Sequence, residues 1–180
     1  YMLVLFICFI SMGIFNTLLT LIESILIPRG ITSVQAGIVG AFFVVAGIVG
    51  AIVLPLISDK LAIRVPLFIG VISLLIPAYL GLTFVSNFIL VSIIAGVAGF
   101  AIMGVAPILF QYGSELAYPI QEGTSLGLML LAGQISGVIF VYIFETIASY
   151  SGSIVWPMLL LVLATIIELP FTLRMKESNY

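Results

Sequence analysis

The sequence has 180 residues, of which 63% are hydrophobic and 7% charged, and its formal net charge is −2. A chain of this composition cannot cover itself with a water-compatible surface, and its few charges form no patch for nucleic acid. We therefore expect an all-α membrane protein, with the lipid bilayer as its solvent.

Six apolar stretches are long enough to cross a membrane, which takes about 20 residues. In chain order they lie near residues 2–27, 34–57, 66–85, 88–112, 122–149 and 153–173. The first is too long for the hydrophobic part of a signal peptide, and no basic segment precedes it. Because the chain begins at Tyr1, we expect either a trimmed start or a piece of a longer protein.

One face of the first span is polar. Asn16, Thr20 and Glu23 recur at spacings of four and three, which puts them on the same side of a helix. Polar side chains at membrane depth cost free energy unless they are paired or wetted. We expect these residues to line a substrate pathway, although Asn16 and Thr20 are equally suited to hydrogen bonds between helices.

Basic residues after the second and sixth spans set the orientation. Lys60 and Arg64 follow the second span, and Arg174 and Lys176 follow the sixth. Basic residues favour the cytoplasmic side in short loops, and alternating crossings put both groups on one side. We expect a multi-pass protein of a plasma or inner membrane, with both termini in the cytoplasm.

Residues 50–70 read GAIVLPLISDKLAIRVPLFIG. Asp59, Lys60 and Arg64 in this stretch resemble the Gly-x-x-x-Asp-Arg-x-Gly-Arg-Arg loop of the major facilitator superfamily. Pro55 and Ala62 occupy the positions where that loop has glycines. The resemblance implies that the motif is less complete in the second half of such transporters. We expect the three charged residues to belong to a cytoplasmic gate, while charges that simply end helices at the interface are the alternative.

Residues 114–125, SELAYPIQEGTS, are predicted to form a cytoplasmic loop between the fourth and fifth spans. Glu122 is expected at the positive end of the fifth helix, with Pro119 in its first turn. Glu115 is expected to pair with the basic residues after the second span and so latch two loops together. Two solvated acids are the alternative, since exposed ion pairs contribute only about 0–1 kcal/mol.

The fifth span repeats the polar face of the first. Gln134 and Glu145 are eleven residues apart and so nearly eclipsed on a helix. We expect both in the substrate pathway. The two outer glutamates, Glu23 and Glu145, would attract a substrate if it is an amine, or would bind a proton if the carrier is proton-coupled. Contact of these glutamates with lipid headgroups is the alternative. Glu168 is expected at the inner interface.

The motif with the most detail spans about two dozen residues, Glu115-x-x-Tyr118-Pro119-x-x-Glu122-Gly123-Thr124 followed by Gly127 and Gln134-Ile135-x-Gly137. It is similar to the segment around helix eleven in the feline leukaemia virus subgroup C receptor family, a branch of the major facilitator superfamily. The resemblance implies a carboxyl-terminal half with spans seven to twelve, a cavity-facing Gln134, and transport of a choline-type amine, with haem also proposed for the family.

The sequence contains a weak internal repeat. It predicts two three-helix units, residues 1–85 and 88–180, in inverted topology, as in half of a major facilitator fold. Glycines in the second, fourth and fifth spans are expected to let helices pack closely, and Gly104 with Pro107 to bend the fourth. Phe9, Phe15, Phe100 and Phe110 are candidates for an aromatic cage around an ammonium group.

The inventory of side chains argues against an enzyme. The chain has no histidine and one aspartate, so we expect neither a serine–histidine nor a paired-aspartate protease, and no His-bound metal, haem or other cofactor. We expect secondary active or facilitative transport of a small solute by alternating access, against a second six-helix bundle. That bundle is a missing amino-terminal half or a second copy. The alternative is a non-transporting scaffold or receptor subunit.

Overall fold

The computed structural model describes residues 1–61 and 63–175. Within them the chain forms six long helices and no strand: α1 (Met2–Leu26), α2 (Ser33–Leu61), α3 (Val65–Phe84), α4 (Phe88–Leu116), α5 (Glu122–Ser151) and α6 (Val155–Thr172), with a short 3₁₀ helix η1 (Ile27–Arg29) after α1. All six are long and apolar enough to cross a membrane. The predicted all-α membrane fold is confirmed.

Two helices run further than the sequence suggested. Helix α2 ends at Leu61 and α4 at Leu116, so Asp59, Lys60 and Glu115 lie on helices and not in loops. The polar ends of these segments carry no proline, and nothing in their local chemistry stops a helix where it leaves the hydrocarbon. The expected position of Pro119 is also wrong, because α5 begins at Glu122 after an N-cap at Gln121.

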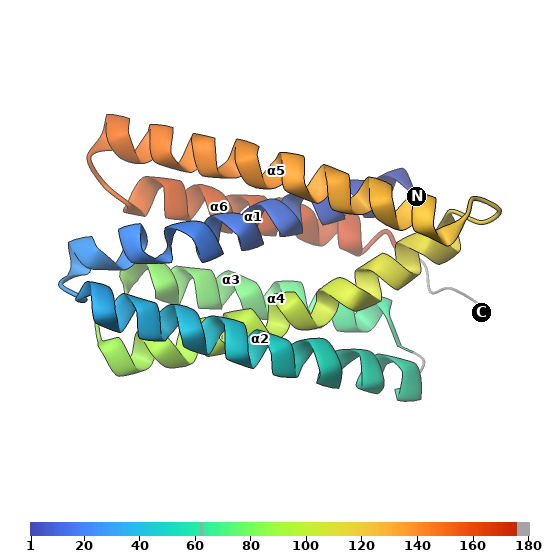
Figure 1. The fold of residues 1–180 in the computed structure, drawn as a ribbon, viewed down its shortest axis with the longest axis horizontal. Coiled ribbons are helices and arrows are strands. Elements are labelled where there is room, and N and C mark those ends of the chain that lie inside the picture. Colours follow the sequence, from blue (N-terminus) through green and yellow to red (C-terminus); the bar gives the residue numbers. More distant parts are fainter. Residues whose placement is uncertain (62, 176–180) are drawn as a thin grey trace.

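The helices pair in a symmetric pattern. Helix α1 packs against α5, α2 against α4, and α3 against α6. Exchanging α1, α2 and α3 with α4, α5 and α6 leaves this pattern unchanged. The division into two inverted three-helix units, residues 1–85 and 88–180, stays a prediction. Figure 1 shows the start of α1, the turn between α2 and α3, and the turn between α4 and α5 at one end of the bundle.

Glycines allow the closest of these contacts. A Cβ atom at Gly99 of α4 would collide with the backbone of Phe43 on α2, and one at Gly50 with the backbone of Phe100. On the other pair, Gly137 of α5 packs against the side chain of Asn16. The expected role of the glycines in close packing is therefore confirmed.

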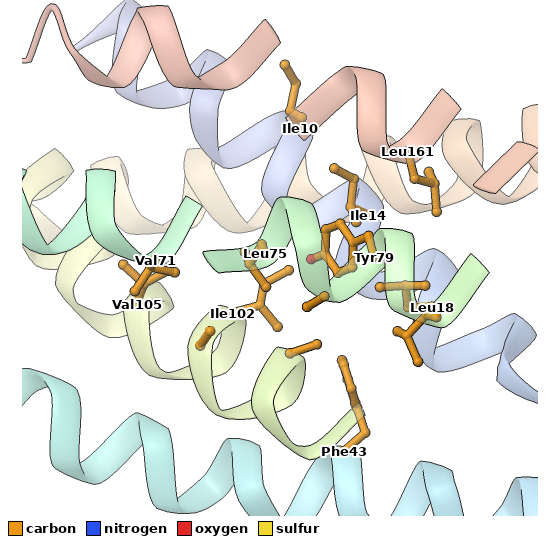
Figure 2. Packing of buried hydrophobic residues seen from close by; sticks show 14 of the residues in the cluster. Ile10, Ile14, Leu18, Phe43, Val71, Leu75, Tyr79, Ile102, Val105 and Leu161 are labelled. Carbon is orange, nitrogen blue, oxygen red and sulfur yellow. The ribbon is translucent and has the colours of Figure 1, made fainter. Parts of the chain in front are cut away.

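The apolar core lies where α1, α3, α4 and α6 meet. Figure 2 shows Ile14 of α1 beside Tyr79 of α3, with Leu161 of α6 near them and Ile102 of α4 nearer to Leu75 of α3. Helices α2 and α5 are the least buried of the six, at 28% and 22% of their most apolar windows. Their outer faces are thus available to lipid or to another bundle.

Candidate functional site

A groove between α1 and α5 gathers polar side chains. It has a volume of about 490 Å³ and is lined by Asn16, Gln134, Gly137, Val138, Val141, Tyr142 and Glu145. We call it the α1–α5 groove. The residues from α5 recur at spacings of three and four, so the helical period puts them on one face. The structure therefore brings together three of the five residues expected in the pathway: Asn16, Gln134 and Glu145.

These three side chains differ in what they contact. Asn16 is half-buried, and its Nδ2 donates a hydrogen bond to the backbone oxygen of Gly133 at 3.4 Å. Gln134 and Glu145 are exposed to the groove. Asn16 thus both joins two helices and lines the groove, so the two interpretations of this residue do not exclude each other.

Thr20 and Glu23 are not among the residues that line the groove. Both are exposed and continue the face of Asn16 along α1, beyond the groove. Tyr142 does line the groove, with 72% of its surface exposed, and the sequence analysis missed it. Its spacing of three from Glu145 was the available signal, because residues three apart on a helix share a face.

Polar contacts join α1 to α5. The Ser136 hydroxyl of α5 donates to the backbone oxygen of Phe9 on α1. Near the end that carries the amino terminus, the Tyr1 hydroxyl donates a hydrogen bond to the backbone oxygen of Ser125 at 3.0 Å. Hydrogen bonds of this kind hold transmembrane helices together with roughly 0.6 kcal/mol each. The wall formed by α1 and α5 is therefore a joined surface.

A second hollow lies between α1 and α4. It has a volume of about 210 Å³ and is lined by Ser11, Met12, Phe15, Ile102, Met103, Val105, Ala106, Pro107, Leu109 and Phe110. We call it the α1–α4 cavity. Met12, Phe15 and Asn16 have spacings of three and four on α1, so this cavity and the α1–α5 groove share one face of that helix.

The cavity unites two of the four aromatic residues considered for a cage. Phe15 and Phe110 both line it, together with two methionines. Phe9 instead lies edge-on to Phe140, with ring centroids 6.4 Å apart, and Phe100 lines a different hollow beside α3. Ring faces and polarisable sulfur suit a quaternary ammonium group better than a hydrated metal ion.

An ion pair lies at the end of the bundle that carries the amino terminus. Arg64, at the start of α3, pairs with Glu115 in the last turn of α4, and the side chains are 15% and 24% exposed. Gln111 also donates to Glu115, at 3.4 Å. The pairing expected of Glu115 with a basic residue is therefore formed, through Arg64.

The remaining residues expected in the gate are arranged differently. Glu122 shares an open cleft of about 740 Å³ with Glu115, between the end of α4 and the start of α5. Asp59 and Lys60 are exposed on the last turn of α2, and the described residues include no ion-pair partner for either. The structure thus pairs Arg64 with Glu115, places Glu122 on the same cleft as Glu115, and leaves Asp59 and Lys60 outside both.

The expectation for Glu168 was wrong. Its side chain is 2% exposed, and the Ser11 hydroxyl of α1 donates a hydrogen bond to its carboxylate. Depth along a span does not reveal which way a side chain faces, and this one faces α1. Within the part of the chain that the structure describes, no three His, Cys, Asp or Glu side chains come together to hold a metal ion.

Comparisons with known proteins identify the relatives of this chain. It is 31% identical over 155 residues to the choline/ethanolamine transporter flvcr2a of Danio rerio, covering 81% of this chain and 32% of that protein. It is 30% identical over 147 residues to solute carrier family 49 member A3 of Xenopus tropicalis, covering 79% and 30%. It is 32% identical over 140 residues to an uncharacterised MFS-type transporter of Caenorhabditis elegans, covering 72% and 23%.

No family model matches the chain. The matched residues make up a third or less of the length of these three relatives. They run through most of this chain, and the six helices agree with half of a major facilitator fold. The chain is therefore related to the FLVCR choline/ethanolamine transporters and to solute carrier family 49, and these similarities support a six-helix half of a major facilitator fold.

Proposed function

We propose that this chain forms one wall of a transporter that moves a small amine, such as choline, across a membrane by alternating access. The observation that carries the proposal is the convergence of Asn16, Gln134 and Glu145 on one groove. Polar groups at membrane depth need water, protein or substrate, because lipid tails offer no partner. A groove that gathers them is the expected surface of a pathway.

An amine suits the chemistry of this surface. Glu145 and Tyr142 both line the groove, and Phe15 and Phe110 line the α1–α4 cavity. Carboxylates attract cations, and aromatic faces bind quaternary ammonium groups. Relatives named as choline/ethanolamine transporters support the same class of substrate. We assign the charge attraction to Glu145, and the orientation of the substrate to Gln134 and Asn16.

A second six-helix bundle completes the pathway in this proposal. The α1–α5 groove is open on one side, and α2 and α5 turn most of their surface outward. Transporters of this class place their substrate between two bundles near the membrane midplane and rock them against each other. The second bundle is an amino-terminal half or another copy of this chain. Thr20 and Glu23 line the outer part of the pathway in this assembly.

The end with the Arg64–Glu115 pair is assigned to the cytoplasm, along with both termini. The pair ties the start of α3 to the last turn of α4, beyond Gly104 and Pro107 within α4. We propose that the end of α4 swings at these two residues and that the ion pair holds it in one state. Glu122 takes the Arg64 charge in the other state, across the open cleft that it shares with Glu115.

Uptake of labelled choline into proteoliposomes tests the proposal. The chain is reconstituted alone and joined to a second six-helix bundle, and Gln134→Ala is compared with Gln121→Ala. Gln121 is exposed at the start of α5 and makes no side-chain cap. We expect uptake that Gln134→Ala removes and Gln121→Ala leaves unchanged. A folded, reconstituted protein with no uptake in either form would support a scaffold or receptor subunit.

A further inference from the structure

Glu168 is a buried acid that the proposed pathway does not use. It lies within the membrane-spanning helix α6 and is 2% exposed. The Ser11 hydroxyl donates to it, and the described residues place no cation against it. A buried charge without a cation costs several kcal/mol, so a proton competes well for this carboxylate.

Ser11 connects this acid to the α1–α4 cavity. Among the residues that line the cavity, Ser11 is the one with a polar side chain. A serine hydroxyl has one proton to donate and two lone pairs that accept. While Glu168 is charged, that proton is committed to the carboxylate, so the Ser11 oxygen offers only lone pairs to the cavity.

Protonation of Glu168 reverses this arrangement. A protonated carboxyl group donates a hydrogen bond, and Ser11 accepts it. The Ser11 hydroxyl, which keeps its own proton, can then rotate and donate towards the cavity. The cavity wall changes from an acceptor beside a negative charge, which favours a cation, to a donor beside a neutral acid, which does not.

We propose that Glu168 and Ser11 form a proton site that competes with binding of a cationic ligand in the α1–α4 cavity. This rests on the proposed function, since the ligand is the amine substrate. It adds a regulation of that site: the cation binds when Glu168 is charged and leaves when Glu168 takes a proton from water. By linkage, the cation lowers the affinity of Glu168 for protons by the same factor.

Glu168 is the group in this region that changes charge with pH, and the other ionisable groups on the helices packed against α6 do not account for the change. Cys8 of α1 and Tyr79 of α3 are buried on helices that pack against α6, and the Tyr79 hydroxyl has no hydrogen-bond partner in the described part of the chain. A thiol and a phenol ordinarily carry their protons at neutral pH, whereas a carboxylic acid does not. On α5, which also packs against α6, the ionisable side chains are all exposed: Glu122, Tyr142, Glu145 and Tyr150.

Infrared difference spectra between alkaline and acidic pH test the proton site without any substrate. We expect the carbonyl band of a protonated carboxylic acid in the wild type, recorded in lipid, and its loss in Glu168→Gln. Glu23→Gln is the control, because Glu23 is exposed and its loss leaves the buried acid in place. A spectrum that Glu168→Gln leaves unchanged overturns the proposal.

Binding measurements test the linkage. Affinities for choline and for 3,3-dimethylbutan-1-ol, its neutral isostere, are compared from about pH 5 to 9, with an expected loss of choline affinity at acid pH of about fivefold or more. The isostere and Glu168→Gln should each show no such loss, and Ser11→Ala should show a smaller one, because the charge of Glu168 still titrates without the serine. Choline binding that ignores pH, or keeps its pH dependence in Glu168→Gln, overturns the linkage. If choline binds at no pH while the infrared band is present, the proposed substrate is wrong and the proton site stands.

Discussion

The Ser11 hydroxyl of α1 donates a hydrogen bond to the Glu168 carboxylate of α6, across 157 positions of sequence. The same serine lines the α1–α4 cavity, and Asn16, five positions further along α1, lines the α1–α5 groove. Helix α1 therefore connects a buried acid, an aromatic cavity and a polar groove.

Removing the charge of Glu145 should weaken binding of a cation. Glu145→Gln keeps the size of the side chain in the groove and removes its attraction for an amine. We expect the KM for choline uptake to rise about tenfold, equivalent to about 1.4 kcal/mol, with little change in kcat. Glu23→Gln, outside the groove, should change KM much less. Equal effects of the two variants would mean that the groove does not position the cation.

Replacing an aromatic ring in the cavity by an aliphatic side chain should separate recognition of the ligand's charge from recognition of its shape. Phe15→Leu keeps the cavity apolar and removes a ring face, which contributes about 0.5–2 kcal/mol to binding of a cation. We therefore expect weaker binding of choline and unchanged binding of 3,3-dimethylbutan-1-ol. Phe84→Leu serves as control, since Phe84 is 62% exposed at the end of α3. A parallel loss for both ligands would assign Phe15 a packing role.

Gly50 should tolerate no side chain. A Cβ there would collide with the Phe100 backbone, so Gly50→Ala must push α2 away from α4. Overpacking of this kind costs about 1–3 kcal/mol, measured as a fall in thermal stability in detergent. Gly37→Ala on the same helix meets nothing within 4 Å and should be neutral or stabilising, because alanine favours a helix by about 0.8–1.0 kcal/mol. Equal melting temperatures for the two variants would contradict this packing.

The Arg64–Glu115 pair should have a small effect on stability and a larger one on transport. A double-mutant cycle with Arg64→Ala and Glu115→Ala should give a coupling energy of about 0.2–1 kcal/mol that falls as salt is added. If the pair holds one state of the transporter, each single variant changes the uptake rate. Lys60→Ala, on the neighbouring turn of α2, should not. An equal change of the uptake rate in Lys60→Ala would mean that the overall surface charge, and not the Arg64–Glu115 pair, affects transport.

The spans, their number and the polar faces could be predicted from the sequence, because hydropathy and the helical period are local properties. Asn16, Gln134 and Glu145 could be placed on two faces, and the structure shows that these faces meet in one groove. The burial of Glu168 could not be predicted, since it depends on Ser11 at the opposite end of the chain. Likewise, α2 and α4 run past the predicted ends of their apolar spans, because helix formation does not depend on hydropathy alone.

The cavity shows a similar limit. Four phenylalanines were equal candidates for a cage, and only their positions in the bundle separate Phe15 and Phe110 from Phe9 and Phe100. One such position is fixed by packing, since the backbone of Phe100 lies against Gly50 of α2. Periodicity within one helix carries no such information.

Labelling of Gln134→Cys by a membrane-impermeant methanethiosulfonate tests the central claim most directly. Cys8 is the one cysteine of the sequence and is fully buried, so the background reaction is low. If Gln134 lines a wet pathway, its cysteine reacts from water and choline slows the reaction, while Leu163→Cys on the outer face of α6 stays unreactive. A Gln134→Cys protein that is as inert as Leu163→Cys, with or without choline, would contradict the account.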